Sequence, residues 1–151
     1  MKVVRLTNTD TALGKKLFVL MASVFEEDTQ PLEDPYLEAL LANPAFWVLG
    51  VWDGDTLVGG LTAHALPMTR SASKELFLYD LAVLPDHQRR GAGRTLVQTL
   101  VQLAAAEGFD NVFVPADVED THAVEFYRAL QGEEAPVAMF TWETTDGRGT
   151  P

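Results

Sequence analysis

The sequence predicts an α/β fold in which helices cover both faces of a mixed, mostly antiparallel sheet. Three observations indicate this fold. Apolar residues make up 47% of the 151 residues, which suits one compact domain with a real core. Segments of strand-like periodicity alternate along the chain with segments of helical periodicity. A polar turn with two glycines, within residues 84–95, joins a strand-like segment to a long helical pattern.

The N-terminal third predicts one strand followed by two helices. The expected elements are a strand at 3–6, a helix at 11–25, an acidic loop at 26–35 and a short helix at 36–41. The second helix is expected to stop near Asn43, because the residue before a proline disfavours helical geometry.

A β-hairpin and a further strand are expected next. Residues 46–52 and 56–65 flank Asp53-Gly54, a dipeptide typical of tight turns. Residues 75–83 alternate in character and predict a third strand of this group. Simple alternation would place Phe77, Tyr79 and Leu81 on one face of that strand and Leu78, Asp80 and Ala82 on the other.

The C-terminal half predicts helix, strand, helix and strand. A helix follows the glycines and ends near Gly108, and a second begins at Asp120 or Thr121 and runs to about Leu130. Strands are expected at 112–118 and 137–142. Pro115 cannot donate to a ladder, so it implies an edge, a bulge or an unpaired stretch. We expect a single domain over 1–143 and a flexible tail over 144–151.

The charge distribution indicates one anionic and one cationic ligand. The net charge of −11 argues against nucleic acid or an anionic membrane as the main partner. Residues 61–100 nevertheless hold five basic and three acidic residues, while the others hold six basic and nineteen acidic. The absence of cysteine excludes disulfides, thiolate metal sites and a cysteine acyl-enzyme, and it fits a cytoplasmic location.

The glycine turn suits a pyrophosphate. Glycine exposes backbone amides, which at a helix N-terminus favour an anion, and three arginines add positive charge. A nucleotide P-loop is excluded, because no Gly-Lys-Ser/Thr ending follows. The third spaced glycine of a dinucleotide fingerprint is also missing. The alternative is a helix start that merely needs a tight turn.

The turn resembles that of the GNAT superfamily of acetyl-CoA-dependent N-acetyltransferases, whose pattern is Gln/Arg-x-x-Gly-x-Gly/Ala. The resemblance implies a GNAT fold with splayed strands, in which this turn grips the CoA pyrophosphate and the preceding strand end pairs with pantetheine. The implied cofactor-binding residues are Leu81, Ala82, Val83, Gln88, Arg89, Arg90, Gly91, Ala92, Gly93, Arg94 and Thr95. It further implies that the Val83 amide polarises the thioester carbonyl, as an oxyanion donor does.

Tyr127 resembles the tyrosine of the GNAT Ala-x-x-Phe-Tyr pattern, here Ala123 to Tyr127. An isolated tyrosine in an apolar helical stripe would be interpreted as a core residue. The resemblance instead implies that Tyr127 protonates the leaving thiolate, for which a phenol is a workable donor. After Tyr127 the chain departs from the family pattern by one extra residue before Gly132.

The acidic residues supply candidates for the base and for substrate binding. Asp80 lies within an otherwise apolar strand, so we expect it to meet a hydrogen-bond donor or a cation. Asp80 or Asp117 is the candidate base, directly or through water. The candidate substrate-binding residues are Glu26, Asp28, Tyr79, Asp80, Asp117, Glu119 and Asp120. Of the histidines only His64 is kept as a base candidate, and no cluster has metal-ligand spacing, so no metal is expected.

Several stretches resemble aminoglycoside 3-N-acetyltransferases of the gentamicin-modifying type. They are residues 36–41, 58–63, 75–83 and 115–117. The resemblance implies direct transfer to the 3-amino group of a deoxystreptamine ring, with antibiotic resistance as the result. An acidic cleft also suits such a polycation. The alternatives are a GNAT acting on polyamines or protein N-termini, and a non-catalytic acyl-CoA-binding module. Dimers are common in the superfamily, although the sequence contains no decisive interface signal.

Overall fold

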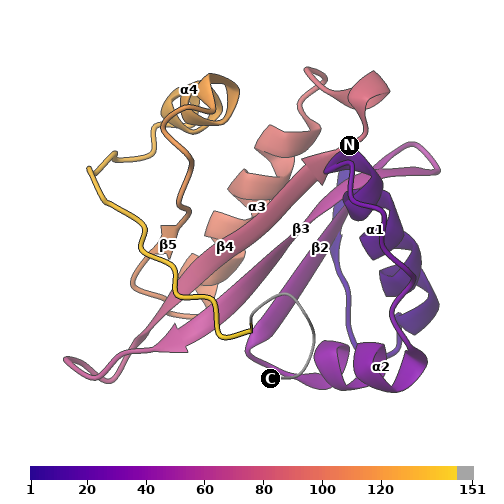
Figure 1. The fold of residues 1–151 in the computed structure, drawn as a ribbon, viewed down its shortest axis with the longest axis horizontal. Helices are drawn as coiled ribbons and strands as arrows, with labels where there is room; N and C mark the ends of the chain where they lie inside the picture. The colour runs from indigo at the N-terminus through magenta and orange to yellow at the C-terminus, as the bar shows by residue number, and fades with distance from the viewer. Residues whose placement is uncertain (146–151) are drawn as a thin grey trace. The chain divides into compact units, whose positions relative to one another are not determined.

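The computed structural model describes residues 1–145, and the chain divides into two compact units, 1–115 and 116 onward. The first unit contains most of the regular structure (Figure 1). Its strands are β1 (Lys2–Arg5), β2 (Phe46–Asp53), β3 (Thr56–Pro67), β4 (Lys74–Val83) and β5 (Val112–Phe113). Its helices are α1 (Thr11–Val24), α2 (Asp34–Ala42), the 3-10 turn η1 (Pro85–His87) and α3 (Ala92–Ala106).

The five strands form one sheet in the order β1-β2-β3-β4-β5. The first three pairings are antiparallel and only β4-β5 is parallel, which confirms the expected mixed, mostly antiparallel sheet. The Asp53-Gly54 hairpin is also confirmed, with Gly54 in the left-handed region at φ 60°. None of the described helices is long and apolar enough to cross a membrane.

Two apolar clusters lie on opposite faces of the sheet. One contains Trp47, Leu61 and Leu78 from the strands together with Leu96 and Leu100 of α3. The other cluster gathers α1 and α2 residues with residues of the opposite face of the sheet. Its members are Leu6, Leu17, Met21, Leu37, Leu41, Phe46, Val48, Leu57 and Ala82. Figure 1 shows the same arrangement, with α1 and α2 on one side of the sheet and α3 on the other.

A β-bulge in β4 corrects the expected alternation of its side chains. Thr62 pairs with Asp80 and Ala63 with Leu78, so Tyr79 is an extra residue without a cross-strand partner. The bulge brings Tyr79 and Asp80 to the same side of the sheet and returns Leu81 to the face of Leu78. The prediction that Tyr79 and Asp80 lie on opposite faces is therefore wrong, because a bulge shifts the two-residue period by one.

The sheet splays at its β4-β5 edge. β5 pairs with β4 only at Leu76–Val112 and Phe77–Phe113, whereas β4 continues to Val83. The strand expected at 112–118 therefore ends after two residues, before Pro115, which has no amide hydrogen to donate. Between Leu78 and Val83, β4 has no strand partner on this side among the described residues.

The second unit contains α4 (Thr121–Ala129), whose N-terminus is capped as expected: the Ala123 amide donates to Asp120 Oδ1 at 3.1 Å. Arg128 forms a bidentate ion pair with Glu134 after the helix. The strand expected at 137–142 is wrong, since residues 130–145 contain no strand. Residue types that favour strands do not form one unless a neighbouring strand offers hydrogen-bond partners to their backbone. Of the expected tail, residues 146–151 lie outside the described residues.

Three helices end in the same Schellman motif, in which two amides after the helix bond to carbonyls of its last turn. In α3 the left-handed position is Gly108, at φ 80°. In α1 it is Glu26, at φ 58°, and in α4 it is Gln131, at φ 66°. A side chain at such a position costs about 1 kcal/mol relative to glycine. The extra residue after Tyr127 leaves Gly132 one place beyond the position that favours glycine.

Candidate active site

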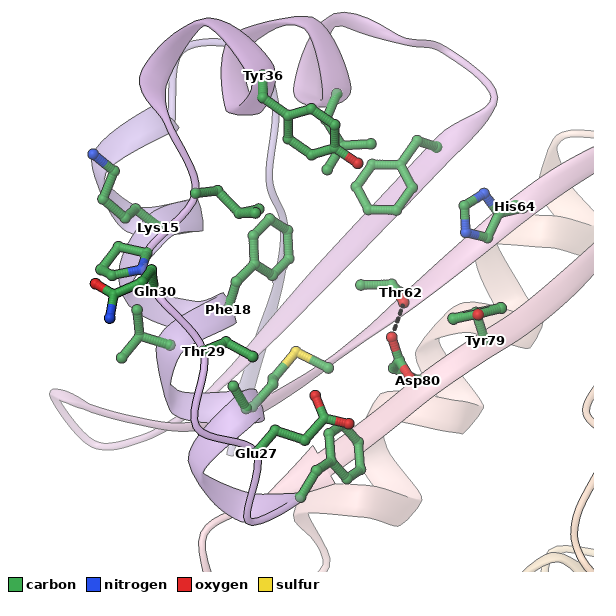
Figure 2. Close-up of a pocket in the computed structure, with 18 residues that line it drawn as sticks. Lys15, Phe18, Glu27, Thr29, Gln30, Tyr36, Thr62, His64, Tyr79 and Asp80 are labelled. Carbon is green, nitrogen blue, oxygen red and sulfur yellow. Dashed lines mark hydrogen bonds between the residues drawn. The ribbon is translucent and has the colours of Figure 1, made fainter. Parts of the chain in front are cut away.

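A cavity of about 420 Å³ opens between α1, the segment that follows it, and strands β3 and β4. Its walls are largely apolar and aromatic, and Phe18, Phe46 and Tyr36 are among them. The polar groups of β3 and β4 are Thr62, His64, Tyr79 and Asp80, which line one side of the cavity (Figure 2). All lining residues belong to the first unit.

Asp80 is the half-buried carboxylate of this cavity. The Thr62 hydroxyl donates a hydrogen bond of 3.3 Å to Asp80 Oδ2, which confirms the expectation that Asp80 meets a donor. Burial raises the pKa of Asp80, the Thr62 hydrogen bond lowers it, and the negative charge of Glu27 raises it again. The net shift of the Asp80 pKa is upward. A carboxylate with a raised pKa is a stronger base than an ordinary surface aspartate.

A second carboxylate reaches the cavity from the end of α1. Glu27 lines the cavity, whereas its neighbours Glu26 and Asp28 do not. Figure 2 shows the Glu27 side chain directed into the cavity, on the side facing Asp80. Glu26 and Asp28 were the substrate-binding residues predicted from this acidic stretch, whereas the structure brings the residue between them, Glu27, together with Asp80.

The histidines occupy three different environments. His64 lines the cavity between Phe46 and Tyr79, with ring centroids 5.2 and 5.5 Å away. His87 lies in η1, 3.6 Å from Asp53, and His122 is exposed on α4. Within residues 1–145 no group of three or more acidic or histidine side chains could hold a metal ion.

The end of β4 presents free backbone toward the splayed side of the sheet. The Leu84 amide donates to the Val58 carbonyl at 2.8 Å, and Gly59 pairs with Val83. In such an antiparallel pair the central residues point their own N–H and C=O away from each other. The Val83 amide is therefore directed away from β3, toward the side where β5 has ended. The Val83 carbonyl accepts a bond of 2.9 Å from the Gln88 side chain.

The glycine turn follows directly and forms the N-terminus of α3. Gly91 is the residue before the helix, at φ 91°, and a Cβ there would meet nothing within 4 Å. No side chain caps this end, so the first amides of α3 stay free of side-chain acceptors. Thr95 is held to Gly91 by backbone and side-chain bonds of 2.9 and 2.7 Å. The turn thus leaves the first amides of α3 without a side-chain acceptor among the described residues and leaves open space beside Gly91, as an anion site requires.

The arginines of the turn differ in their surroundings. Arg90 lies 3.8 Å from Asp53 of the β2-β3 hairpin, so part of its charge is balanced within the protein. Arg89 adopts a positive φ of 63°, and both Arg89 and Arg94 are exposed. Neither forms an ion pair within the described part of the chain. These two arginines are therefore the cations of the turn that remain available to an anion.

The other predicted site residues belong to the second unit. Tyr127 lies on α4, where burial and the Asp120 carboxylate raise the pKa of its hydroxyl. Asp120 also caps the helix, and Asp117 Oδ1 accepts the Glu119 amide at 2.9 Å. The carboxylates of Asp117 and Asp120 therefore each carry a local structural role.

Two features of the site were missed by sequence reasoning. Thr62 is the hydrogen-bond partner of Asp80, but nothing in a strand of small and apolar residues marks one threonine as special. The aromatic wall was not foreseen, because its residues were assigned only to a helix and a strand. Phe18 of α1 and Phe46 of β2, with ring centroids 6.4 Å apart, both line the cavity.

The splayed mixed sheet, the glycine turn before α3 and the cavity beside β4 together are typical of an acyltransferase fold. The chain matches the Acetyltransferase (GNAT) family over residues 15–132 and belongs to that family. Members of this family use acetyl-CoA as cosubstrate. The matched stretch contains the cavity residues, the glycine turn and Tyr127.

Among solved structures, an aminoglycoside acetyltransferase from an uncultured soil metagenomic sample, in complex with sisomicin, is 32% identical. It has a TM-score of 0.91, and the match covers 95% of this chain and 96% of that one. A second soil aminoglycoside acetyltransferase is 30% identical, with a TM-score of 0.87 and coverage of 95% and 98%. A curated relative, the ribosomal protein bS18-alanine N-acetyltransferase of Escherichia coli K12, is 31% identical over 84 residues. That match spans 56% of this chain and 57% of the relative.

Proposed function

We propose that this protein transfers an acetyl group from acetyl-CoA to an amine of an aminoglycoside, at the 3-amino group of a deoxystreptamine ring, and so confers resistance to gentamicin-type antibiotics. The observation that carries the proposal is the half-buried Asp80 with a raised pKa, in a cavity next to the free Leu81–Val83 backbone. The reaction is direct transfer in a ternary complex, since the chain has no cysteine to carry an acyl group. Its location would be the cytoplasm, where acetyl-CoA is supplied.

The residues present fit acetyl-CoA. The uncapped N-terminus of α3, with Gly91 in open space and Arg89 and Arg94 exposed, suits its pyrophosphate. The outward-facing backbone of Leu81 and Val83 suits an extended amide chain such as pantetheine. When bound, acetyl-CoA supplies an acetyl group activated as a thioester. In this proposal Gln88 keeps the end of β4 in place through its bond to the Val83 carbonyl.

Three groups of the chain then handle charge and protons. Asp80 accepts a proton from the attacking ammonium, because an amine is nucleophilic only after it loses that proton. The Val83 amide donates to the oxygen on which negative charge develops. The Tyr127 hydroxyl supplies a proton on the leaving side, and its raised pKa keeps it protonated at neutral pH. Asp80 is preferred to Asp117 as the base, because Asp117 is occupied by the Glu119 amide.

The aminoglycoside substrate is supported by two soil aminoglycoside acetyltransferases that cover 95% of this chain. Their similarity extends over the full fold, whereas the bS18-alanine acetyltransferase match spans 56% of the chain. That second relative favours one alternative, acetylation of a protein N-terminus. Tyr79, an exposed residue of the cavity lining, would contact the substrate beside Asp80, and Asp117, Glu119 and Asp120 remain candidates for binding ammonium groups.

The test is thiol release from acetyl-CoA by the purified protein, with gentamicin, sisomicin, spermidine and a peptide beginning with alanine in parallel. Fast turnover with the aminoglycosides alone supports the proposal. Turnover with the peptide or spermidine alone overturns the substrate assignment. Acetyl-CoA binding without turnover of any amine would instead support a non-catalytic module.

A further inference from the structure

The cavity holds two carboxylates, Asp80 and Glu27. Lys15 is the lysine among its lining residues, but its ammonium is bound to Asp34, which lies outside the lining. Within residues 1–145, neither Asp80 nor Glu27 forms an ion pair. His64 also lines the cavity, and its charge lowers the pKa of Asp80. Over the described residues, the free protein therefore presents two carboxylates without an ion-pair partner between largely apolar walls.

The position of Glu27 is set by the end of α1 rather than by a loose loop. The Glu27 amide donates to the Ala22 carbonyl at 3.0 Å, and the Glu26 amide donates to Ser23 at 3.2 Å. Glu26 takes the left-handed conformation that completes this motif. Because two hydrogen bonds fix this backbone, Glu27 enters the cavity from a defined point (Figure 2).

Two like charges that line one largely apolar cavity favour a positively charged ligand. The charge of Glu27 disfavours the ionised form of Asp80 in the free protein. A single ammonium can neutralise only one of the two groups. A ligand with two ammonium groups can neutralise both, and each charge-assisted hydrogen bond is strengthened by the apolar surroundings.

We propose that Glu27 is a specificity-determining residue, which binds a second ammonium group of the substrate while Asp80 receives the proton of the reacting one. This inference rests on the proposed function, because it assigns the second contact of the same amine cavity. The substrate class that follows is a compact diamine with both amines on one ring. Aromatic side chains such as Phe18 and Phe46 would then pack against the carbon framework of that ring.

The test compares 1,3-diaminocyclohexane with cyclohexylamine, which differ by one amine. In the wild-type protein kcat/KM should favour the diamine by about 10-fold. Glu27→Gln should bring the ratio near unity by raising KM for the diamine more than KM for the monoamine. Glu26→Gln and Asp28→Asn are matched controls, because they remove a charge on either side without touching the cavity lining. Both controls should keep the wild-type ratio.

A preference for the diamine that survives Glu27→Gln would overturn the assignment, as would an equal loss in Glu26→Gln. Calorimetric titration of both amines into each variant measures binding directly, so it tests the role of Glu27 even if no acetyl transfer occurs. Weaker binding of the diamine by Glu27→Gln alone supports the role of Glu27, and unchanged binding refutes it. Absence of acetyl transfer to any amine would count against the proposed function, while the titration would still report on Glu27.

Discussion

Thr62 and Asp80 face each other across β3 and β4 and are joined by a hydrogen bond of 3.3 Å at the point where β4 bulges. The bulge places Asp80 in the cavity, and the threonine hydroxyl offsets part of the burial that raises the pKa of Asp80. The pairing therefore governs both the position and the proton affinity of the proposed base.

Asp80→Asn should reduce kcat by about 100-fold or more at neutral pH, because an amide cannot accept the proton of the ammonium. Binding of acetyl-CoA should be unchanged. Steady-state kinetics and calorimetry on the same preparation measure both. Asp86→Asn, at an exposed position in η1, is the control for loss of one negative charge. Activity near the wild-type level in Asp80→Asn would assign the base elsewhere.

The acid limb of the pH profile should move in opposite directions in two variants. A base works when deprotonated, so activity is lost as pH falls through its pKa. Thr62→Val removes a bond that lowers the pKa of Asp80, so the loss should begin at higher pH. Glu27→Gln removes a charge that raises this pKa, so activity should persist to lower pH. The same amine substrate is used for every variant, so that its own ionisation affects all profiles equally. A shift of the acid limb in the same direction in both variants would contradict the assignment of Asp80 as the base.

Gly91→Glu should weaken CoA binding by about 100-fold or more, because a carboxylate beside the free amides of α3 repels the pyrophosphate. Gly91→Ala is the control, since it introduces the same strain at φ 91° without charge. Calorimetric titration with CoA should show much tighter binding to the alanine variant. Equal affinities for the two variants would exclude this turn as the anion site.

Tyr127→Phe should lower kcat by about 10- to 100-fold with little effect on KM for acetyl-CoA. Because the pKa of Tyr127 is raised, ionisation of this hydroxyl should cause no loss of activity below about pH 10. Phe126→Leu, at the neighbouring position of α4, controls for altered packing of the helix. Wild-type kcat in Tyr127→Phe would remove the proton-donor role.

Glu26→Gly should stabilise the fold by about 0.5–1 kcal/mol, because glycine adopts the left-handed conformation at φ 58° without strain. Urea unfolding monitored by circular dichroism measures the change in the free energy of unfolding. Gly108→Ala should lower the free energy of unfolding, because it replaces the glycine that α3 already has at the equivalent left-handed position. A destabilised Glu26→Gly variant would mean that the glutamate side chain makes a favourable contact of its own.

Much of the architecture could be predicted from local patterns. The hairpin at Asp53-Gly54, the helix that begins after Gly91 and the cap at Asp120 each depend on neighbouring residues, and each is confirmed. The strand expected at 137–142 was wrong, because pairing depends on a partner that residue types do not reveal. Of the acidic residues 26–28, Glu26 and Asp28 were predicted to bind substrate, whereas Glu27 lines the cavity, because residue order does not reveal which side chain points inward.

The sequence alone determined the fold class, the glycine turn and the resemblance to GNAT acetyltransferases, since these depend on periodicity and on short motifs. Only the tertiary structure decided which carboxylates meet. The bulge at Tyr79 brought Asp80 to the cavity beside Thr62, and the turn at Glu26 brought Glu27 there instead of its neighbours. The physical reason is that one residue in a left-handed or bulged conformation redirects every side chain around it, and residue type alone did not mark these two positions.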